Sequence, residues 1–384
     1  MAVRVAGQCL VDAANPADLP RAAARAARQA MASAPSPSLL VCFVGGVGRL
    51  PHGAMRDIAA AVTPLAPQAA RLIVETSAPV GVGVEREGQL AVSALALDRS
   101  VATPVLGAFK ATADESQWGR RVAEAVSARP DGGRAPRLVL AFLAPEGHRL
   151  DAIESLSAPG LPPVVGGGCQ SLFAGAPGEP AEPASAAVVP IASPLGVALV
   201  SSPACRLISP WVRVEQSDGQ FLLRTERGPA LDLLSESAPG GASKDPVLVA
   251  VRGDEEGAPP LLRTVVGVDA GRGAVGVSEA IAPGATVAFA VRDAEAARAD
   301  FQRRLAELAR GLRGAAPAAG VMFTCGGRGI GLYRRRDVDA GMFRARFGEV
   351  PVAGMQSAFE IAPWGGRSRL QLFTAVAVVF YRPS

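Results

Sequence analysis

Hydrophobic and polar positions follow one order that occurs three times along the chain. In the first pass, residues 19–32 are rich in alanine, the best helix former, and Pro16 and Pro20 fit the first turn of a helix. An apolar run at 39–44, helical spacing at 55–65 and apolar runs at 72–74 and 90–97 follow. The pattern predicts a unit of helix, strand, helix, strand and strand.

A second pass through this order begins near Gln117. It predicts a helix over 118–128, a strand over 138–143, a short helix over 150–156, a glycine-rich apolar segment over 164–171 and a strand over 196–201.

The third pass occupies the C-terminal part of the chain. A helix is expected over 294–312, because Phe301, Leu305, Leu308 and Leu312 form one apolar stripe at helical spacing. A strand over 321–323, a short helix over 339–347, an apolar segment over 351–357 and a strand over 370–380 follow.

A short segment connects the second pass with the third. Residues 168–173, Gly-Cys-Gln-Ser-Leu-Phe, resemble residues 354–359, Gly-Met-Gln-Ser-Ala-Phe, and this match pairs Gln170 with Gln356. Chance similarity between α/β units is the alternative, but repetition of the whole order favours homologous copies.

The region between the second and third passes is rich in strands. We expect strands over 207–214 and 220–224, a helix over 229–234 and a hairpin of 262–268 with 274–277. The glycines of residues 271–276 match G-x-G-x-x-G, but another apolar run follows instead of a helix, so a hairpin turn explains them better. Stretches rich in Pro, Gly and Ser at 175–185 and 237–245 predict exposed loops or a linker.

The predicted fold class is α/β of the mixed α+β kind. The repeated units are expected to form two pseudo-symmetric lobes of mixed sheets flanked by helices. We expect two domains: residues 15–204 would hold two units, and residues 205–384 would hold the strand-rich insert and the third unit. With 384 residues, 49% of them hydrophobic, the chain is long enough for two or three cores.

Charge and cysteine content narrow the function classes. The net charge is +4, but the only lysines are Lys110 and Lys244, the arginines are scattered among 35 acidic residues, and aromatic residues are 5% of the chain. This pattern disfavours a nucleic-acid partner. The five cysteines are widely spaced and never form a C-x-x-C pair, which argues against disulfides and zinc. The start of the chain does not resemble a signal peptide, and no apolar run is long enough for a membrane span, so we expect a cytoplasmic protein with no metal or cofactor.

The residues with candidate chemistry lie in the third pass. The strand over 321–323 leads into Cys325, Gly326, Gly327 and Arg328, and Glu360 follows on a second apolar segment. Glycines let a backbone approach a ligand, and the guanidinium of Arg328 suits a carboxylate or phosphate. A thiol, a guanidinium and a carboxylate near glycine turns indicate a small-molecule site.

Each of these residues also has a structural interpretation. Cys325 can be a small buried hydrophobe, and Arg328 can form an internal ion pair with Glu360. Glu360 stands among apolar residues, where a carboxylate needs a partner or a raised pKa, or it faces water at a strand end. Gln356 and Gln170 can bind a ligand or satisfy strand ends.

Signatures of common enzymes are absent from the sequence. Neither a Walker A lysine motif nor a G-x-S-x-G elbow occurs. The two histidines, His52 and His148, each follow the first strand of a copy and have no carboxylate cluster beside them, so they make a poor metal site. A Cys325 nucleophile with a histidine base stays open at this point.

The C-terminal part resembles the FIST family. The resemblance rests on a strand ending in Cys-x-x-Arg, a Pro-x-x-Gly strand entry, a Glu-Ile step and a final strand with a threonine; these are Cys325, Arg328, Pro351, Gly354, Glu360-Ile361 and Thr374. The layout of the N-terminal half agrees, so the resemblance covers residues 15–381. It implies a stand-alone sensory module of signal transduction that binds small ligands such as amino acids. Phe359 and the Leu372-Phe373 pair depart from the family pattern and make the expected pocket more apolar.

We therefore expect a small-ligand-binding sensory protein. The resemblance implies that Cys325, Gly326, Gly327, Arg328, Gly354, Gln356, Glu360 and Thr374 form the ligand site. Arg328 and backbone amides would hold an anionic group, and Glu360 would orient a donor such as an amino group. A signalling protein is the expected second partner. The alternatives are an enzyme that uses Cys325 and a scaffold that binds proteins through an exposed apolar patch.

Overall fold

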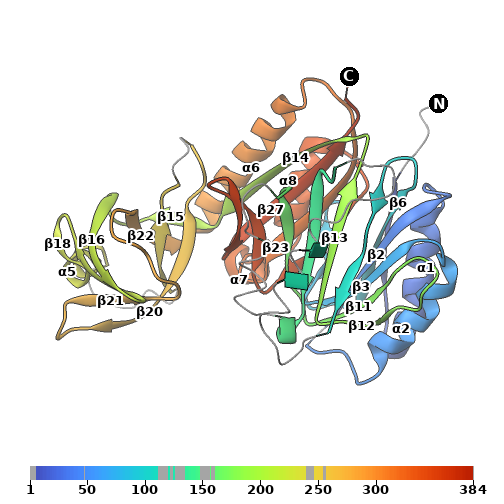
Figure 1. Cartoon of the computed structure of the whole chain (residues 1–384), viewed down its shortest axis with the longest axis horizontal. Coiled ribbons are helices and arrows are strands. Elements are labelled where there is room, and N and C mark those ends of the chain that lie inside the picture. Colours follow the sequence, from blue (N-terminus) through green and yellow to red (C-terminus); the bar gives the residue numbers. More distant parts are fainter. Residues whose placement is uncertain are drawn as a thin grey trace.

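Three sheets with the same strand order form the main body of the computed structural model (Figure 1). The structure describes residues 6–46, 48–110, 120–121, 124–125, 135–147, 156, 161–238, 246–253 and 257–383. The mixed α+β class is confirmed, because most strands lie in mixed sheets and helices flank them.

Each sheet has a parallel pair of strands at its centre. In sheet order, the first sheet is β1(Ala6–Asp12), β6(Ala91–Asp98), β2(Pro37–Gly45), β3(Ala70–Thr76), β11(Ser171–Gly175) and β12(Glu182–Pro183). The second is β7(Thr103–Pro104), β13(Ala186–Ala192), β9(Leu138–Leu143), β10(Val164–Gly168), β25(Glu360–Trp364) and β26(Arg367–Gln371), with β8(Gly107–Phe109) also on β13. The third is β14(Gly196–Pro203), β27(Thr374–Tyr381), β23(Pro317–Cys325), β24(Val352–Ser357), β4(Pro79–Gly81) and β5(Val84–Glu85).

The three copies exchange strands. After the second strand of each parallel pair, the chain leaves its own sheet and joins a neighbouring one: β4 pairs with β24, β11 with β3, and β25 with β10. Every sheet is thus completed by a segment from another copy. The expected arrangement in two lobes is therefore wrong, since the three sheets enclose one common core.

The centre of that core is aromatic. Phe43, Phe142 and Phe323 stand at matching places on β2, β9 and β23, and their ring centroids lie 6.0 Å (Phe43 to Phe142) and 5.8 Å (Phe142 to Phe323) apart. All three are buried, and burial of each phenylalanine side chain contributes roughly 1.5–3 kcal/mol. Because both faces of the central strands are covered, these strands read as continuous apolar runs in the sequence.

Helices cover the outer faces of the first and third sheets. α1(Leu19–Met31), with η1(Pro16–Asp18) before it, and α2(Ala54–Val62), with η2(Thr63–Leu65) after it, pack on the first sheet. The alanines of α1 let it approach β1 closely, and a side chain at Gly7 would clash with the carbonyl oxygen of Ala30. α6(Ala294–Gly311) and α8(Val338–Phe347) pack on the third sheet through Phe301, Leu305 and Phe343.

A smaller body of strands lies beside the main body (Figure 1). Its eight-stranded sheet contains β15(Cys205–Leu207), β22(Thr286–Arg292), β16(Val212–Asp218), β17(Phe221–Thr225), β21(Ala274–Val277), β20(Leu261–Asp269) and β19(Val247–Val251), with β18(Gly228–Pro229) beside β17. α5(Ala230–Ser237) packs against this sheet. The hairpin expected around residues 271–276 is confirmed by the antiparallel pair β20 and β21.

Several expected elements are corrected by the strand pairing. The strand over 196–201 does not complete the second copy: as β14 it pairs with β27 in the third sheet, and β13, which we did not predict, completes the second. The strand over 370–380 is broken at Leu372 and Phe373, and the strand over 207–214 is broken between β15 and β16. The helix expected over 118–128 lies mostly, and that over 150–156 almost entirely, outside the described residues.

The match between residues 168–173 and 354–359 is out of register by two positions. Phe142 is opposite Gly167, and Phe323 is opposite Met355, so Gly168 rather than Gln170 corresponds to Gln356.

The division of the chain into two domains, residues 15–204 and 205–384, stays a prediction. Within the described part of the chain, no helix is long and apolar enough to cross a membrane.

Candidate functional site

The three strand exchanges meet in a closed ring of hydrogen bonds. We call residues 75–79, 168–171 and 356–360 the crossing segments, because the chain changes sheets there. The Gln170 N–H donates to the Glu75 carbonyl oxygen, the Ala358 N–H to that of Gly168, and the Gln356 N–H to that of Ala78. All three segments follow the carboxyl ends of the central parallel strands. Such ends are where open α/β sheets bind ligands.

Polar side chains from all three copies lie in this ring. Gln356 is 2% exposed; its Oε1 accepts from Ser77 Oγ at 3.4 Å, and its Nε2 donates to Glu87 Oε2 at 3.4 Å. Both bonds are long for hydrogen bonds. The side-chain oxygen Oε1 of Gln170 is buried and has no hydrogen-bond partner. The ring therefore contains polar groups that its own structure satisfies poorly.

Two carboxylates lie at the edge of the ring. Glu75 is buried and accepts from the Leu50 N–H at 2.9 Å and from Ser171 Oγ at 2.5 Å. Glu87 accepts from the Ile330 N–H at 2.8 Å. Among the described residues, neither carboxylate forms an ion pair with a cation. Sequence reasoning missed both, since they belong to the first copy and carry no motif.

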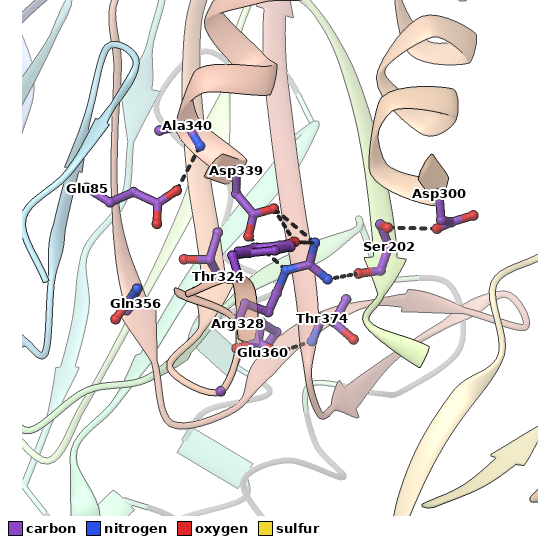
Figure 2. Close-up of polar contacts among 12 residues, drawn as sticks. Glu85, Ser202, Asp300, Thr324, Arg328, Asp339, Ala340, Gln356, Glu360 and Thr374 are labelled. Carbon is purple, nitrogen blue, oxygen red and sulfur yellow. Dashed lines mark hydrogen bonds and ion pairs between the residues drawn. The ribbon is translucent and has the colours of Figure 1, made fainter. Parts of the chain in front are cut away.

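Arg328 does not face this ring. It is fully buried, and its Nε and one terminal nitrogen donate to the carboxylate of Asp339 at 2.8 and 2.9 Å (Figure 2). The same two-pronged group donates to Tyr333 Oη at 2.7 Å and to the Ser202 carbonyl oxygen at 3.0 Å. Burial would lower the pKa of Arg328, but the Asp339 carboxylate outweighs it and raises this pKa. The alternative interpretation of Arg328 as a member of an internal ion pair holds, but Asp339 and not Glu360 is its partner.

A second buried carboxylate stands near this pair. Glu85, on β5, accepts from the Ala340 N–H at 2.8 Å, and its own N–H donates to Asp337 Oδ1 at 2.6 Å. Burial, and then the nearby Asp339 charge, raise the pKa of Glu85 to about 8. No motif in the sequence points to Glu85. Asp339 is the first residue of the helix expected over 339–347. An acidic residue in a first helical turn is explained by its favourable interaction with the helix dipole, so it does not stand out as part of a site.

Glu360 lies on the inner side of the third crossing segment. It is fully buried, and its carboxylate accepts from Ser357 Oγ at 2.8 Å and from the Thr374 N–H at 3.1 Å (Figure 2). Burial raises the pKa of Glu360 to about 8, although these two hydrogen bonds oppose the shift. The carboxyl group therefore holds its proton to higher pH than an exposed glutamate does.

Cys325 lies beside Glu360 and is 5% exposed. Its sulfur accepts hydrogen bonds from the backbone N–H groups of Gly327 and Phe373, which lower the pKa of the thiol. Burial, and then the Glu360 charge, outweigh them and raise this pKa to about 12. Phe373 has a left-handed φ of 54°, a strained conformation that directs its N–H to the sulfur. A thiol with so high a pKa is a poor nucleophile, which weighs against an enzyme that uses Cys325.

The structure separates the expected site residues into four groups. Cys325, Glu360 and Thr374 lie together with the backbone of Gly326 and Gly327, and Gln356 lies in the ring. Arg328 is held on the other side by Asp339. Gly354 is within β24, where a side chain would clash with the Met322 carbonyl oxygen, so its role is close strand packing. Of the two histidines, His52 is exposed and His148 lies outside the described residues.

One further polar atom is unsatisfied behind the ring. Thr324 is fully buried, and its Oγ1 has no hydrogen-bond partner. It is opposite Gln356 in the parallel pair of β23 and β24. Among the described residues, no group of three His, Cys, Asp or Glu side chains could hold a metal ion.

Comparison with known proteins finds a match to one family model. Residues 230–363 match the family model described as the FIST C domain. An uncharacterized protein of Mycobacterium tuberculosis is 36% identical over 193 residues, which are 47% of this chain and 50% of the relative. One of Mycobacterium bovis is 35% identical over 196 residues, 48% of this chain and 50% of the relative. The chain thus spans about half the length of the curated relatives it matches.

Solved structures resemble the chain only weakly. A cyanuric acid hydrolase from A. caulinodans is 11% identical over 98% of this chain and 99% of its own, with a TM-score of 0.39. PurLQS from Thermotoga maritima reaches a TM-score of 0.24 at 10% identity, over 98% of this chain and 72% of its own. Neither likeness is close enough to support an argument about function.

Proposed function

The chain is a FIST-domain protein, with the C domain at residues 230–363, and from this premise we propose that it binds a small amine-bearing ligand at the ring of crossing segments. FIST domains are sensory domains of signalling proteins. The observation that carries the proposal is the meeting of Ser77, Gln170 and Gln356, one from each copy, in a ring with unsatisfied hydrogen-bonding groups.

The polar groups of the ring favour a ligand that donates hydrogen bonds. Glu75 and Glu87 supply carboxylate oxygens without a cation partner among the described residues, and Gln170 Oε1 is an open acceptor. Ammonium groups donate up to three hydrogen bonds and carry the charge that such carboxylates attract. An amino acid or a related amine is the ligand class that fits.

This proposal changes the roles first expected of two residues. The guanidinium of Arg328 already donates to Asp339, Tyr333 and Ser202. We therefore assign Arg328 to positioning the loop of Gly326 and Gly327 instead of holding an anion. Glu360 and Cys325 support the third crossing segment from its buried side. A signalling protein that reads the ligand-bound state is the proposed partner.

Calorimetry with a panel of amino acids and small diamines tests the proposal. We expect one class of amine to bind saturably, and Glu87→Gln and Gln356→Leu to weaken that binding about tenfold or more, a change of ~1.4 kcal/mol. Glu295→Gln is the matched control, because Glu295 is an exposed glutamate in the first turn of α6. Circular dichroism should show all three variants folded.

Two results would contradict the site. One is the absence of saturable binding for every amine tested. The other is binding that Glu87→Gln and Gln356→Leu leave unchanged, which would place the ligand elsewhere in the molecule.

A further inference from the structure

A groove lies between α6 and α8, on the outside of the third sheet. The two helices are in contact, and in Figure 1 α6 reaches the top of the main body with α8 next to it. The groove has a volume of about 500 Å³, which is in the range of small-molecule sites. Its polar lining comes from Arg298 and Gln302 of α6, from Arg335 and Asp337 of the preceding loop, and from Arg346 of α8.

The arginines in the groove differ from their neighbours on the same helices. Arg303 and Arg304 of α6 pair with Asp300 and Glu307, and Arg344 of α8 pairs with Glu349 at 2.5 Å. Among the described residues, the groove arginines Arg298, Arg335 and Arg346 form no ion pair. Three arginines beside the groove are thus neutralised by acids, whereas the three arginines inside it are not.

The one acid in the lining does not neutralise them. Asp337 Oδ1 accepts the Glu85 N–H at 2.6 Å, so its carboxylate is held toward β5. Asp339, in the first turn of α8, is buried and paired with Arg328. The lining therefore carries three positive charges and one negative charge, and the amino end of α8 adds a further positive potential.

The floor of the groove is apolar. Leu305 and Val338 are buried there, and Met342 is half-buried. Gly341 faces open space, so α8 has no side chain at this position to fill the groove. A site with a charged rim and an apolar floor favours an anion that carries an apolar or planar body over a bare inorganic ion.

We propose that this groove binds a small organic phosphate, with the phosphate groups on Arg298, Arg335 and Arg346 and the organic body on the floor formed by Leu305, Val338 and Met342. Guanidinium groups recognise phosphate oxygens by paired hydrogen bonds. The site is separate from the ring of crossing segments and does not rest on the amine ligand proposed there.

Titration calorimetry with ADP and with inorganic pyrophosphate tests this site. We expect saturable binding of ADP that weakens with added salt, and weaker binding of pyrophosphate, which cannot use the apolar floor. Arg298→Gln, Arg335→Gln and Arg346→Gln should each weaken ADP binding about five- to tenfold, and the triple variant should abolish it. Arg303→Gln and Arg344→Gln are the matched controls and should bind ADP like the unaltered protein.

Three results would overturn the proposal. They are no saturable ADP binding at millimolar concentrations, pyrophosphate binding as tight as that of ADP, and control variants that lose as much affinity as the groove variants. Arg335 and Arg346 are exposed and Arg298 is half-buried, so the single variants should change the unfolding transition little.

Discussion

Among the described residues, Arg71 and Arg328 are the two largest fully buried side chains, and their guanidinium groups are held in opposite ways. Arg71, on β3, donates to five backbone carbonyl oxygens: those of Ala66, Pro67, Ala69, Ala176 and Glu179. Arg328, after β23, pairs instead with a buried carboxylate. The first joins the hairpin of β11 and β12 to the first copy, and the second forms part of an electrostatic network. Two arginines buried to the same extent can thus differ in role: one connects backbone segments, and the other neutralises a buried carboxylate.

The largest effect is expected from Arg328→Met. Removing the guanidinium leaves the Asp339 carboxylate buried without a partner, which typically costs about 3–5 kcal/mol. Urea unfolding followed by circular dichroism measures the loss. The double variant Arg328→Met with Asp339→Leu should recover much of it, because no buried charge remains. A double variant as unstable as the single one would contradict the charge argument.

A smaller loss is expected from Arg71→Met, about 2–3 kcal/mol, because only neutral carbonyl groups lose their donor. The same unfolding measurement applies. Glu179→Gln, which alters the acid nearest this arginine, should change stability by less than about 0.5 kcal/mol. If that substitution cost as much as the loss of Arg71, the two buried arginines would not differ in kind.

The charged network should also make stability depend on pH. Glu85 and Glu360 have pKa values of about 8 in the folded protein, above the ordinary value of 4.5. Folded protein therefore holds protons that unfolded protein releases between these values, so stability should fall as pH rises from about 5 to 8. Glu360→Gln should flatten part of this slope, as measured by thermal unfolding across that range. Arg71→Met should leave the slope unchanged.

The smallest difference is expected between two buried thiols. Cys42, on β2 of the first copy, and Cys325, near Arg328, both have pKa values raised to about 12, mainly by burial. Neither should react with iodoacetamide in the native protein at pH 8, whereas both should react in urea. Mass spectrometry of the labelled peptides gives the result. Selective labelling of Cys325 at this pH would show that the backbone amides of Gly327 and Phe373 outweigh burial.

The sequence predicted the central strands and helices well, because strands buried on both faces read as apolar runs and α6 shows a clear stripe. It did not predict the strand exchange. β4, β11 and β25 are three to five residues long, and each pairs with a distant copy, so local patterns contain no trace of their partners.

Only the part of the candidate site that lies in one copy could be predicted from the sequence, because contacts between copies leave no local pattern. Cys325, Glu360 and Thr374 stand out in one copy, and the structure brings them together. The partners of Arg328 and Gln356, which are Asp339 and Glu87, come from a helix start and from the first copy. Only the fold places them beside these residues.

The exchanged strands have a consequence for how this protein can be divided. A fragment of residues 205–384 would lack β4, β5 and β14, and its β24 would present an unpaired edge, while β25 and β26 would have no sheet to join. Such edges recruit other chains and aggregate. Pairing across hundreds of residues also slows folding, since distant segments must meet before any sheet is complete. Each copy therefore depends on the other two for a complete sheet, and we expect the polypeptide to fold as one unit.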